Sequence, residues 1–159
     1  MDEKYKSLLF KIVNLWPDNK LVLYRLANYY KLKSQFQISL DIYKKILDHY
    51  DSNDNDLFLY ASNLDKIGRW KEARVLFLQL LNNNPRDTYT LNYVSYKLAL
   101  KNQELDFAFD LIKKALTIDP DNGYFLDTLG WVEYKRNNFN SAVYFLEKSV
   151  SILPRSAEV

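Results

Sequence analysis

Few residues in this sequence could do chemistry. The chain of 159 residues contains a single histidine, His49, and no cysteine, so thiol chemistry is excluded. A general base or a metal ion needs partners close by, and neither a second histidine nor a recognisable acid pair accompanies His49. We expect His49 instead to lie near the end of a helix, where its ring interacts with carbonyl groups that have no partner within the helix.

The densest group of metal-ligand side chains is the run of acids and amides at residues 51–56. A calcium loop needs a central glycine and a glutamate at its end, and this run has neither. We interpret it as a solvated linker that caps the helix after it. The three glycines are too scattered to form a phosphate-binding loop. The sequence therefore predicts a protein that is not an enzyme, with no catalytic residue, no cofactor and no metal site.

Composition favours a helical protein. Apolar residues make up 48% of the chain and charged residues 26%, which is typical of a globular protein. Only 3 glycines and 4 prolines are present, too few for the many turns of a β-sandwich or barrel. The net charge of +2 and the lack of a long apolar run predict neither nucleic-acid binding nor membrane insertion. We expect a cytoplasmic location, or a periplasmic or envelope-associated one if the chain belongs to a longer exported protein.

An internal period of 34 or 35 residues runs through the chain. Leucines mark it at Leu23, Leu57, Leu91 and Leu126. Two series of small residues keep the same register: Ala27, Ala61, Ser95 and Gly130, and then Ser39, Ala73, Ala108 and Ala142. Small side chains let two helix backbones approach closely, and larger residues around them then lock the crossing. We therefore predict helical hairpins in which the two series face each other.

Part of the last period resembles the tetratricopeptide repeat (TPR) motif. The resemblance rests on residues 126–130 and 138–142, on Leu146 and on Pro154. One departure is Glu133, which stands where the family usually has an aromatic residue.

The resemblance implies an all-α fold, an α-α superhelix (TPR solenoid) of about nine antiparallel-paired helices. It covers a single TPR domain, residues 1–159, with a half repeat at 3–17 and full repeats at about 20–53, 54–87, 88–122 and 123–156. The stretch from residue 91 to residue 149 is similar to TPR segments of larger bacterial proteins. In such a fold the first helix of each repeat lines a concave groove.

The helical register selects the first-helix positions that face this groove. They are Tyr24, Asn28, Lys31, Phe58, Ser62, Asp65, Tyr89, Asn92, Tyr96, Tyr124, Asp127, Trp131 and Tyr134. Aromatic rings beside Asn, Asp and Lys suit a peptide groove, since they combine rigid contact area with a few orienting hydrogen bonds. Alternatively, the rings pack against neighbouring first helices. A clamp for a C-terminal carboxylate, as in chaperone-binding TPRs, is disfavoured because Asp65 and Asp127 would repel it.

The leading hypothesis is a non-enzymatic scaffold that binds a peptide or protein segment in the TPR groove. One alternative is a helical-repeat RNA-binding module, because pentatricopeptide repeats have a similar shape. Another is the interaction module of a larger enzyme or assembly. The chain begins with a second helix and has no polar capping helix, so we expect either part of a longer array or self-association through uncapped ends. In either case Leu146, Val150 and Leu153 should lie near another surface.

Overall fold

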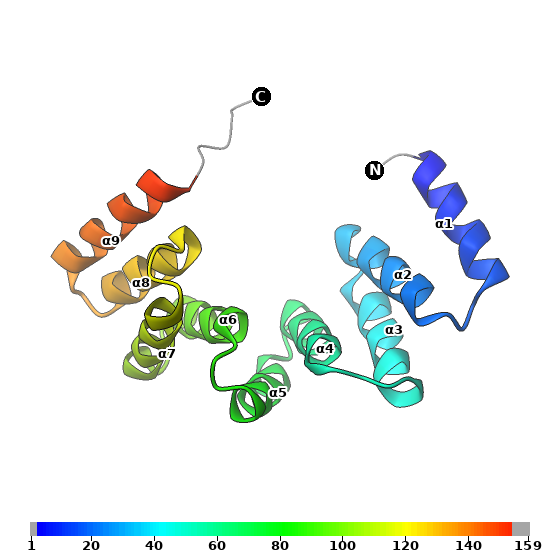
Figure 1. The fold of residues 1–159 in the computed structure, drawn as a ribbon, viewed down its shortest axis with the longest axis horizontal. Coiled ribbons are helices and arrows are strands. Elements are labelled where there is room, and N and C mark those ends of the chain that lie inside the picture. The colour runs from blue at the N-terminus through cyan, green and yellow to red at the C-terminus, as the bar shows by residue number, and fades with distance from the viewer. Residues whose placement is uncertain (1–2, 154–159) are drawn as a thin grey trace. The chain divides into compact units, whose positions relative to one another are not determined.

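The computed structural model describes residues 3–153, which form nine α-helices joined by short turns and contain no strand (Figure 1). The helices are α1 (Glu3–Leu15), α2 (Lys20–Leu32), α3 (Phe36–His49), α4 (Asp54–Lys66), α5 (Trp70–Asn83), α6 (Thr88–Leu100), α7 (Leu105–Ile118), α8 (Gly123–Lys135) and α9 (Phe139–Ile152). The all-α helical-repeat fold is therefore confirmed. The end of the last predicted repeat, residues 154–156 with Pro154, lies outside the described residues.

The chain forms two compact units, which are described separately. Unit 1 ends at Gln79 and unit 2 begins at Leu80, so the boundary falls within α5.

The helix starts follow the same period as the small residues. An Asn or Asp precedes each of α2, α4, α6 and α8, and its side chain accepts hydrogen bonds from backbone N–H groups of the first turn. These caps are Asn19, Asn53, Asp87 and Asn122. Each hairpin turn has a residue with a positive φ at the same place, namely Ser34, Gly68, Asn102 and Asn137, and the α6–α7 turn has a second one, Glu104. Only one of the four is glycine, and serine or asparagine supplies the left-handed turn elsewhere.

In unit 1, α2 packs against α3, and α3 packs against α4. The core of this packing is a cluster of Leu23, Ala27, Tyr43 and Ile46. Leu59, from α4, packs against the edge of the same cluster. One cluster thus joins the hairpin to the next first helix.

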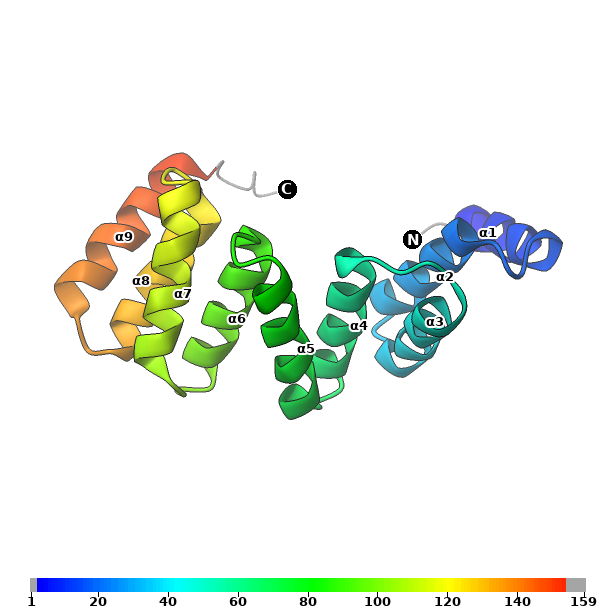
Figure 2. The same ribbon diagram turned by 60° about the horizontal axis from the view of Figure 1, so that its bottom comes forward.

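In unit 2, α6 packs against α7 and α8 packs against α9 (Figure 2). The Ser95 hydroxyl of α6 donates a hydrogen bond of 2.7 Å to the Ala108 carbonyl of α7. At the crossing of α8 and α9, a Cβ atom added to Gly130 would stand 2.7 Å from Leu146 Cγ and 3.2 Å from the Ala142 carbonyl oxygen. The predicted facing of small residues is confirmed for both pairs.

The acidic run at 51–56 is only partly the solvated linker that its composition predicts. Asn53 and Asp56 form a capping box at the start of α4, which confirms the capping role. However, Asp56 is fully buried, and its carboxylate pairs with the Lys20 ammonium at 2.9 Å. The prediction of a solvated side chain is wrong at this residue, because a lysine at the start of α2 reaches the capping box.

His49 is the last residue of α3, and its Nδ1 lies 3.2 Å from the Lys45 carbonyl oxygen. This placement confirms the predicted position of His49 at the end of a helix, but the carbonyl beside the ring is one turn earlier than the free carbonyls of the helix end.

Glu133 replaces the usual aromatic residue with a polar network. Its buried carboxylate accepts a hydrogen bond of 2.5 Å from Asn138 Nδ2 and lies 3.5 Å from Arg136 Nη1. The Arg136 guanidinium also pairs with Asp106 at 2.9 Å and lies 4.3 Å from the centre of the Phe109 ring. The Glu133 carboxylate, which stands where the resemblance predicts an aromatic residue, is therefore paired with both Asn138 and Arg136.

Candidate functional site

The predicted groove residues on α2 are partly used for packing. Tyr24 is half-buried against the core cluster of unit 1, and its ring meets Tyr43 edge to face at 6.1 Å. Asn28 is exposed. Burial, and then the positive charge of Lys66, lower the pKa of Lys31, which is half-buried. An ammonium at this position is therefore held at some cost to the fold.

The predicted groove residues on α4 are more deeply packed. Phe58 is half-buried and meets Phe77 of α5 edge to face at 5.4 Å between ring centres. Ser62 is 5% exposed and Asp65 7% exposed. The Ser62 hydroxyl donates to the Leu59 carbonyl at 2.9 Å. Little of this helix face is open within unit 1.

The predicted residues on α6 are more open. Tyr89 is 77% exposed, and Tyr96, near the middle of the helix, is also exposed. Asn92 lies between them and is half-buried. Its Oδ1 atom is buried and accepts no hydrogen bond from the residues that the structure describes.

The predicted residues on α8 form an aromatic stack. Trp131 and Tyr134 are stacked with ring centres 5.4 Å apart and planes 20° apart. The Lys135 ammonium lies 4.9 Å from the centre of the Trp131 ring, and Phe139 meets Tyr134 edge to face at 5.8 Å. Tyr124, at the start of the helix, is 67% exposed. The Trp131 Nε1 atom is buried and has no hydrogen-bond acceptor among residues 3–153.

Asp127 stands one turn before Trp131 on α8. Its side chain is exposed at the surface, yet burial of the carboxyl group by its surroundings raises its pKa. Lys135 has its ammonium over the aromatic rings, and no hydrogen bond or ion pair joins Asp127 to another side chain in the described part of the chain. The carboxylate is thus partly removed from water without a compensating positive charge.

Since α6 packs against α8, these residues lie on neighbouring first helices of one unit. We call them the α6–α8 surface: Tyr89, Asn92, Tyr96, Tyr124, Asp127, Trp131 and Tyr134. The surface combines exposed rings with two acceptors and one donor that lack partners.

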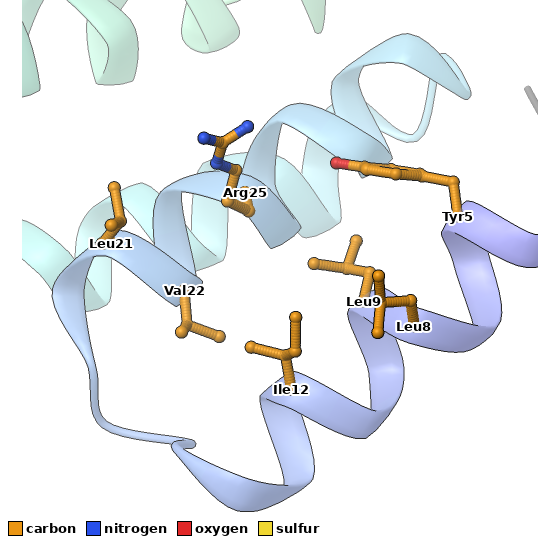
Figure 3. A pocket seen from close by; sticks show the side chains of 7 residues that line it. All are labelled: Tyr5, Leu8, Leu9, Ile12, Leu21, Val22 and Arg25. Atoms are coloured by element: carbon orange, nitrogen blue, oxygen red, sulfur yellow. The ribbon is translucent and has the colours of Figure 1, made fainter.

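A second open surface was missed by the sequence analysis. An apolar groove of about 300 Å³ lies between α1 and α2. Its lining residues are Tyr5, Leu8, Leu9 and Ile12 of α1 and Leu21, Val22 and Arg25 of α2, and Figure 3 shows their side chains around the space between the two helices. The period could have predicted this groove. Leu9 and Ile12 stand 34 residues before Tyr43 and Ile46, which are buried in the core cluster together with residues of α2.

Two other kinds of site were searched for. Within residues 3–153, no group of three or more His, Asp or Glu side chains could hold a metal ion. No helix in the same range is long and apolar enough to cross a membrane.

Comparison with known proteins assigns the repeat. The tetratricopeptide repeat family model matches residues 57–87, which include most of α4 and all of α5. The structure is similar to that of YrrB, a TPR protein with an unusual peptide-binding site, with a TM-score of 0.69 and 21% identity over 97% of this chain and 79% of that one. This chain is a tetratricopeptide repeat protein. A second similar structure is a TPR protein from Parabacteroides merdae, with a TM-score of 0.75 and 20% identity over 93% of this chain and 59% of that one.

Curated relatives of this TPR protein are longer. The mitochondrial import receptor subunit TOM70 of Mus musculus is 23% identical over 86% of this chain and 22% of its own length. A TPR repeat-containing protein of Methanocaldococcus jannaschii is 30% identical over 69% of this chain and 19% of its own length. The chain therefore spans about a fifth of the length of the curated relatives it matches. The fold is that of a protein–protein interaction scaffold.

Proposed function

We propose that this TPR protein is a non-enzymatic scaffold that binds a peptide or protein segment in its groove. The thirteen first-helix residues predicted from the sequence are the proposed contact positions, and the seven of the α6–α8 surface carry the proposal. The observation behind it is that exposed aromatic rings there stand beside polar atoms that have no partner among the described residues.

The chemistry of the α6–α8 surface suits a polypeptide. Tyrosine and tryptophan provide large contact areas while losing little rotamer freedom on binding. The hydroxyl groups of the exposed Tyr89 and Tyr124 can exchange hydrogen bonds with the carbonyl and N–H groups that an extended backbone presents. A peptide-binding site is also named for the similar TPR protein YrrB, which supports this reading.

The test compares proteins captured by the wild type and by the double variant Trp131→Ala/Tyr134→Ala. Tyr144→Ala is the matched control, because Tyr144 is also an exposed tyrosine but lies on the second helix α9. We expect the double variant to lose specific partners that the control retains, with unchanged helical circular dichroism. If the captured proteins are the same for all three, the surface is wrongly assigned. A shift of single-stranded RNA at physiological ionic strength would instead favour the RNA-binding alternative.

A second candidate function is self-association, which the exposed apolar residues near the two ends favour. Leu8 and Leu21 are exposed beside the α1–α2 groove, and Val150 is exposed on α9. Sedimentation velocity of the wild type and of Leu8→Asp tests this. A concentration-dependent dimer that the variant lacks supports the candidate, and a monomer at all concentrations contradicts it.

A further inference from the structure

The apolar groove between α1 and α2 repeats a surface that is covered elsewhere in unit 1. We infer that this groove receives an amphipathic helix of a partner protein, which presents a leucine to Leu9 and Ile12 and, one turn later, a carboxylate to Tyr5 and Arg25. None of the lining residues is among the thirteen contact positions proposed above, so the two sites can be tested separately.

The covered counterpart of the groove lies one period later. Four lining residues stand 34 residues before four residues of the core cluster of unit 1: Leu8, Leu9, Ile12 and Arg25 before Ile42, Tyr43, Ile46 and Leu59. In that cluster, α2 covers the surface with Leu23 and Ala27. Ile42 is half-buried there, whereas Leu8 is 58% exposed at the groove. The shape that fits such a surface is therefore a helix with an apolar stripe.

Tyr5 is the residue at which the groove departs from the repeat. It stands one period before Ser39, in the series of small second-helix residues. Later members of this series meet a small first-helix residue, at the α6–α7 and α8–α9 crossings. That first-helix residue comes four positions after the leucine of its repeat, as Ala27 follows Leu23. A tyrosine leaves no room for so close a crossing, so the corresponding residue of a bound helix meets the ring and its hydroxyl instead.

The polar groups of the groove can both donate hydrogen bonds. The Tyr5 hydroxyl points across the groove toward α2, on the side that carries Arg25 (Figure 3). Neither side chain makes a hydrogen bond or an ion pair with another residue of the range 3–153. All other lining residues are Leu, Ile or Val, so the groove holds a guanidinium without an acid. A carboxylate four positions after the leucine of the partner helix complements both donors.

Charge favours an acidic helix over a symmetric pair of copies of this chain. Helix α1 carries three lysines, Lys4, Lys6 and Lys11, and one acid, Glu3. A two-fold dimer through the groove would bring the same patch of both copies together, and with it these lysines and both Arg25 side chains. Like charges that face each other oppose association, whereas an acidic helix is attracted.

The probe is a capped, alanine-based helical peptide of about 16 residues, with leucines along one face and a glutamate four positions after the first leucine. Matched peptides have glutamine or lysine in place of the glutamate. Each peptide carries a fluorophore and is titrated with the full chain, and fluorescence anisotropy gives the dissociation constant. We expect the glutamate peptide to bind about tenfold more tightly than the glutamine peptide, as a charge-assisted hydrogen bond provides. The lysine peptide should bind most weakly.

Three variants test the two donors. Arg25→Gln keeps much of the stem and should bring the glutamate and glutamine peptides to about equal affinity. Lys11→Gln is the matched control, because Lys11 is an exposed cation of α1 that does not line the groove, and it should keep the full preference. Tyr5→Phe removes only the hydroxyl and should lower the preference about threefold. A preference that survives Arg25→Gln overturns the role of the carboxylate.

Two further variants test the location. Leu8→Asp places a charge at an exposed residue of the groove and should weaken binding of the glutamate peptide at least about tenfold, with unchanged circular dichroism. Trp131→Ala/Tyr134→Ala should bind it with wild-type affinity, even if that variant shows the α6–α8 surface to be wrongly assigned. Equal binding by the wild type and Leu8→Asp, or no binding by either, overturns the site. A dimer that the glutamate peptide does not dissociate in sedimentation velocity also overturns it, because a second copy then fills the groove.

Discussion

One repeat position is used in opposite ways by the two units. The period aligns Tyr24, Phe58, Asn92 and Asp127, and it aligns the second-helix residues Tyr43, Phe77, Ile112 and Leu146. In unit 1 both pairs are aromatic, and the rings meet edge to face at 6.1 and 5.4 Å. In unit 2 the second-helix residues are aliphatic and the first-helix residues are polar. The Asn92 Oδ1 atom and the Asp127 carboxylate then have no hydrogen-bond partner among the described residues.

The comparison shows that a first-helix ring is packed where the second helix places another ring opposite it. Phe77 is fully buried and contacts both Phe58 and Trp70, so it closes the face of α4. Leu146 packs instead against the small site at Gly130, and it has no ring to pair with a neighbour. Packing in unit 1 and the binding proposed for unit 2 are two uses of one register.

The largest expected effect comes from removing the aromatic that closes unit 1. Phe77→Ala should lower the free energy of unfolding by about 3–5 kcal/mol, because a fully buried ring is replaced by a cavity. Chemical denaturation followed by circular dichroism measures the change. Val75→Ala, at an exposed site on the same helix, should change stability by less than about 0.5 kcal/mol. A loss below about 1 kcal/mol for Phe77→Ala would show that the ring pair does not stabilise unit 1.

A smaller effect on stability is expected when Phe58 of unit 1 is replaced by asparagine, the residue that unit 2 has at the same repeat position. Phe58→Asn exchanges a half-buried ring for an amide, and it should cost about 2–3 kcal/mol of unfolding free energy. The reverse exchange, Asn92→Phe, buries no polar atom and should cost less than Phe58→Asn in the same denaturation assay. Equal losses in the two directions would mean that the position is not specialised in either unit.

Much of the fold follows from the sequence, because the crossing of two helices leaves no room for large side chains. The period of small residues therefore predicts that Ser95 and Gly130 lie at helix crossings. The position of His49 at the end of a helix could be predicted from the sequence as well. The caps before the first helices share the period, so Asn19 and Asn122 could have been found in the same way.

The openness of each groove position could not be predicted, since it depends on the residue that the neighbouring helix places opposite. Phe58 and Asp127 occupy the same register. The Phe58 ring packs against Phe77 of the second helix, whereas the Asp127 carboxylate has no charged partner in the described part of the chain, and the sequence does not show this difference in packing. Asp56 illustrates the same limit, because its burial depends on Lys20, which is distant in sequence. Periodicity describes the scaffold, whereas long-range pairs decide which side chains remain available.

Unit 2 should tolerate the loss of an exposed ring. Tyr134→Ala removes the stack on Trp131 and the edge contact with Phe139, and it should cost no more than about 1 kcal/mol of unfolding free energy. The same variant should weaken peptide binding at the α6–α8 surface. Denaturation and the capture of partner proteins separate the two effects. A stability loss as large as that of Phe58→Asn would show that the Tyr134 ring stabilises the fold in the way that the packed rings of unit 1 do.

The smallest expected effect is the pH dependence caused by Asp127. Burial raises the pKa of its carboxyl above the ordinary value of 3.8, so between these two pKa values the folded protein binds more protons than the unfolded chain. The contribution of Asp127 to the free energy of unfolding therefore falls as the pH rises from 3.8 through the folded-state pKa. At pH 7 the ionised group is unfavourable, so Asp127→Asn should melt slightly above the wild type, and the difference should shrink as the pH falls to 3.8. A lower melting temperature for Asp127→Asn at neutral pH would reveal a stabilising partner for the carboxylate, and the contrast between the two units would then lose its chemical basis.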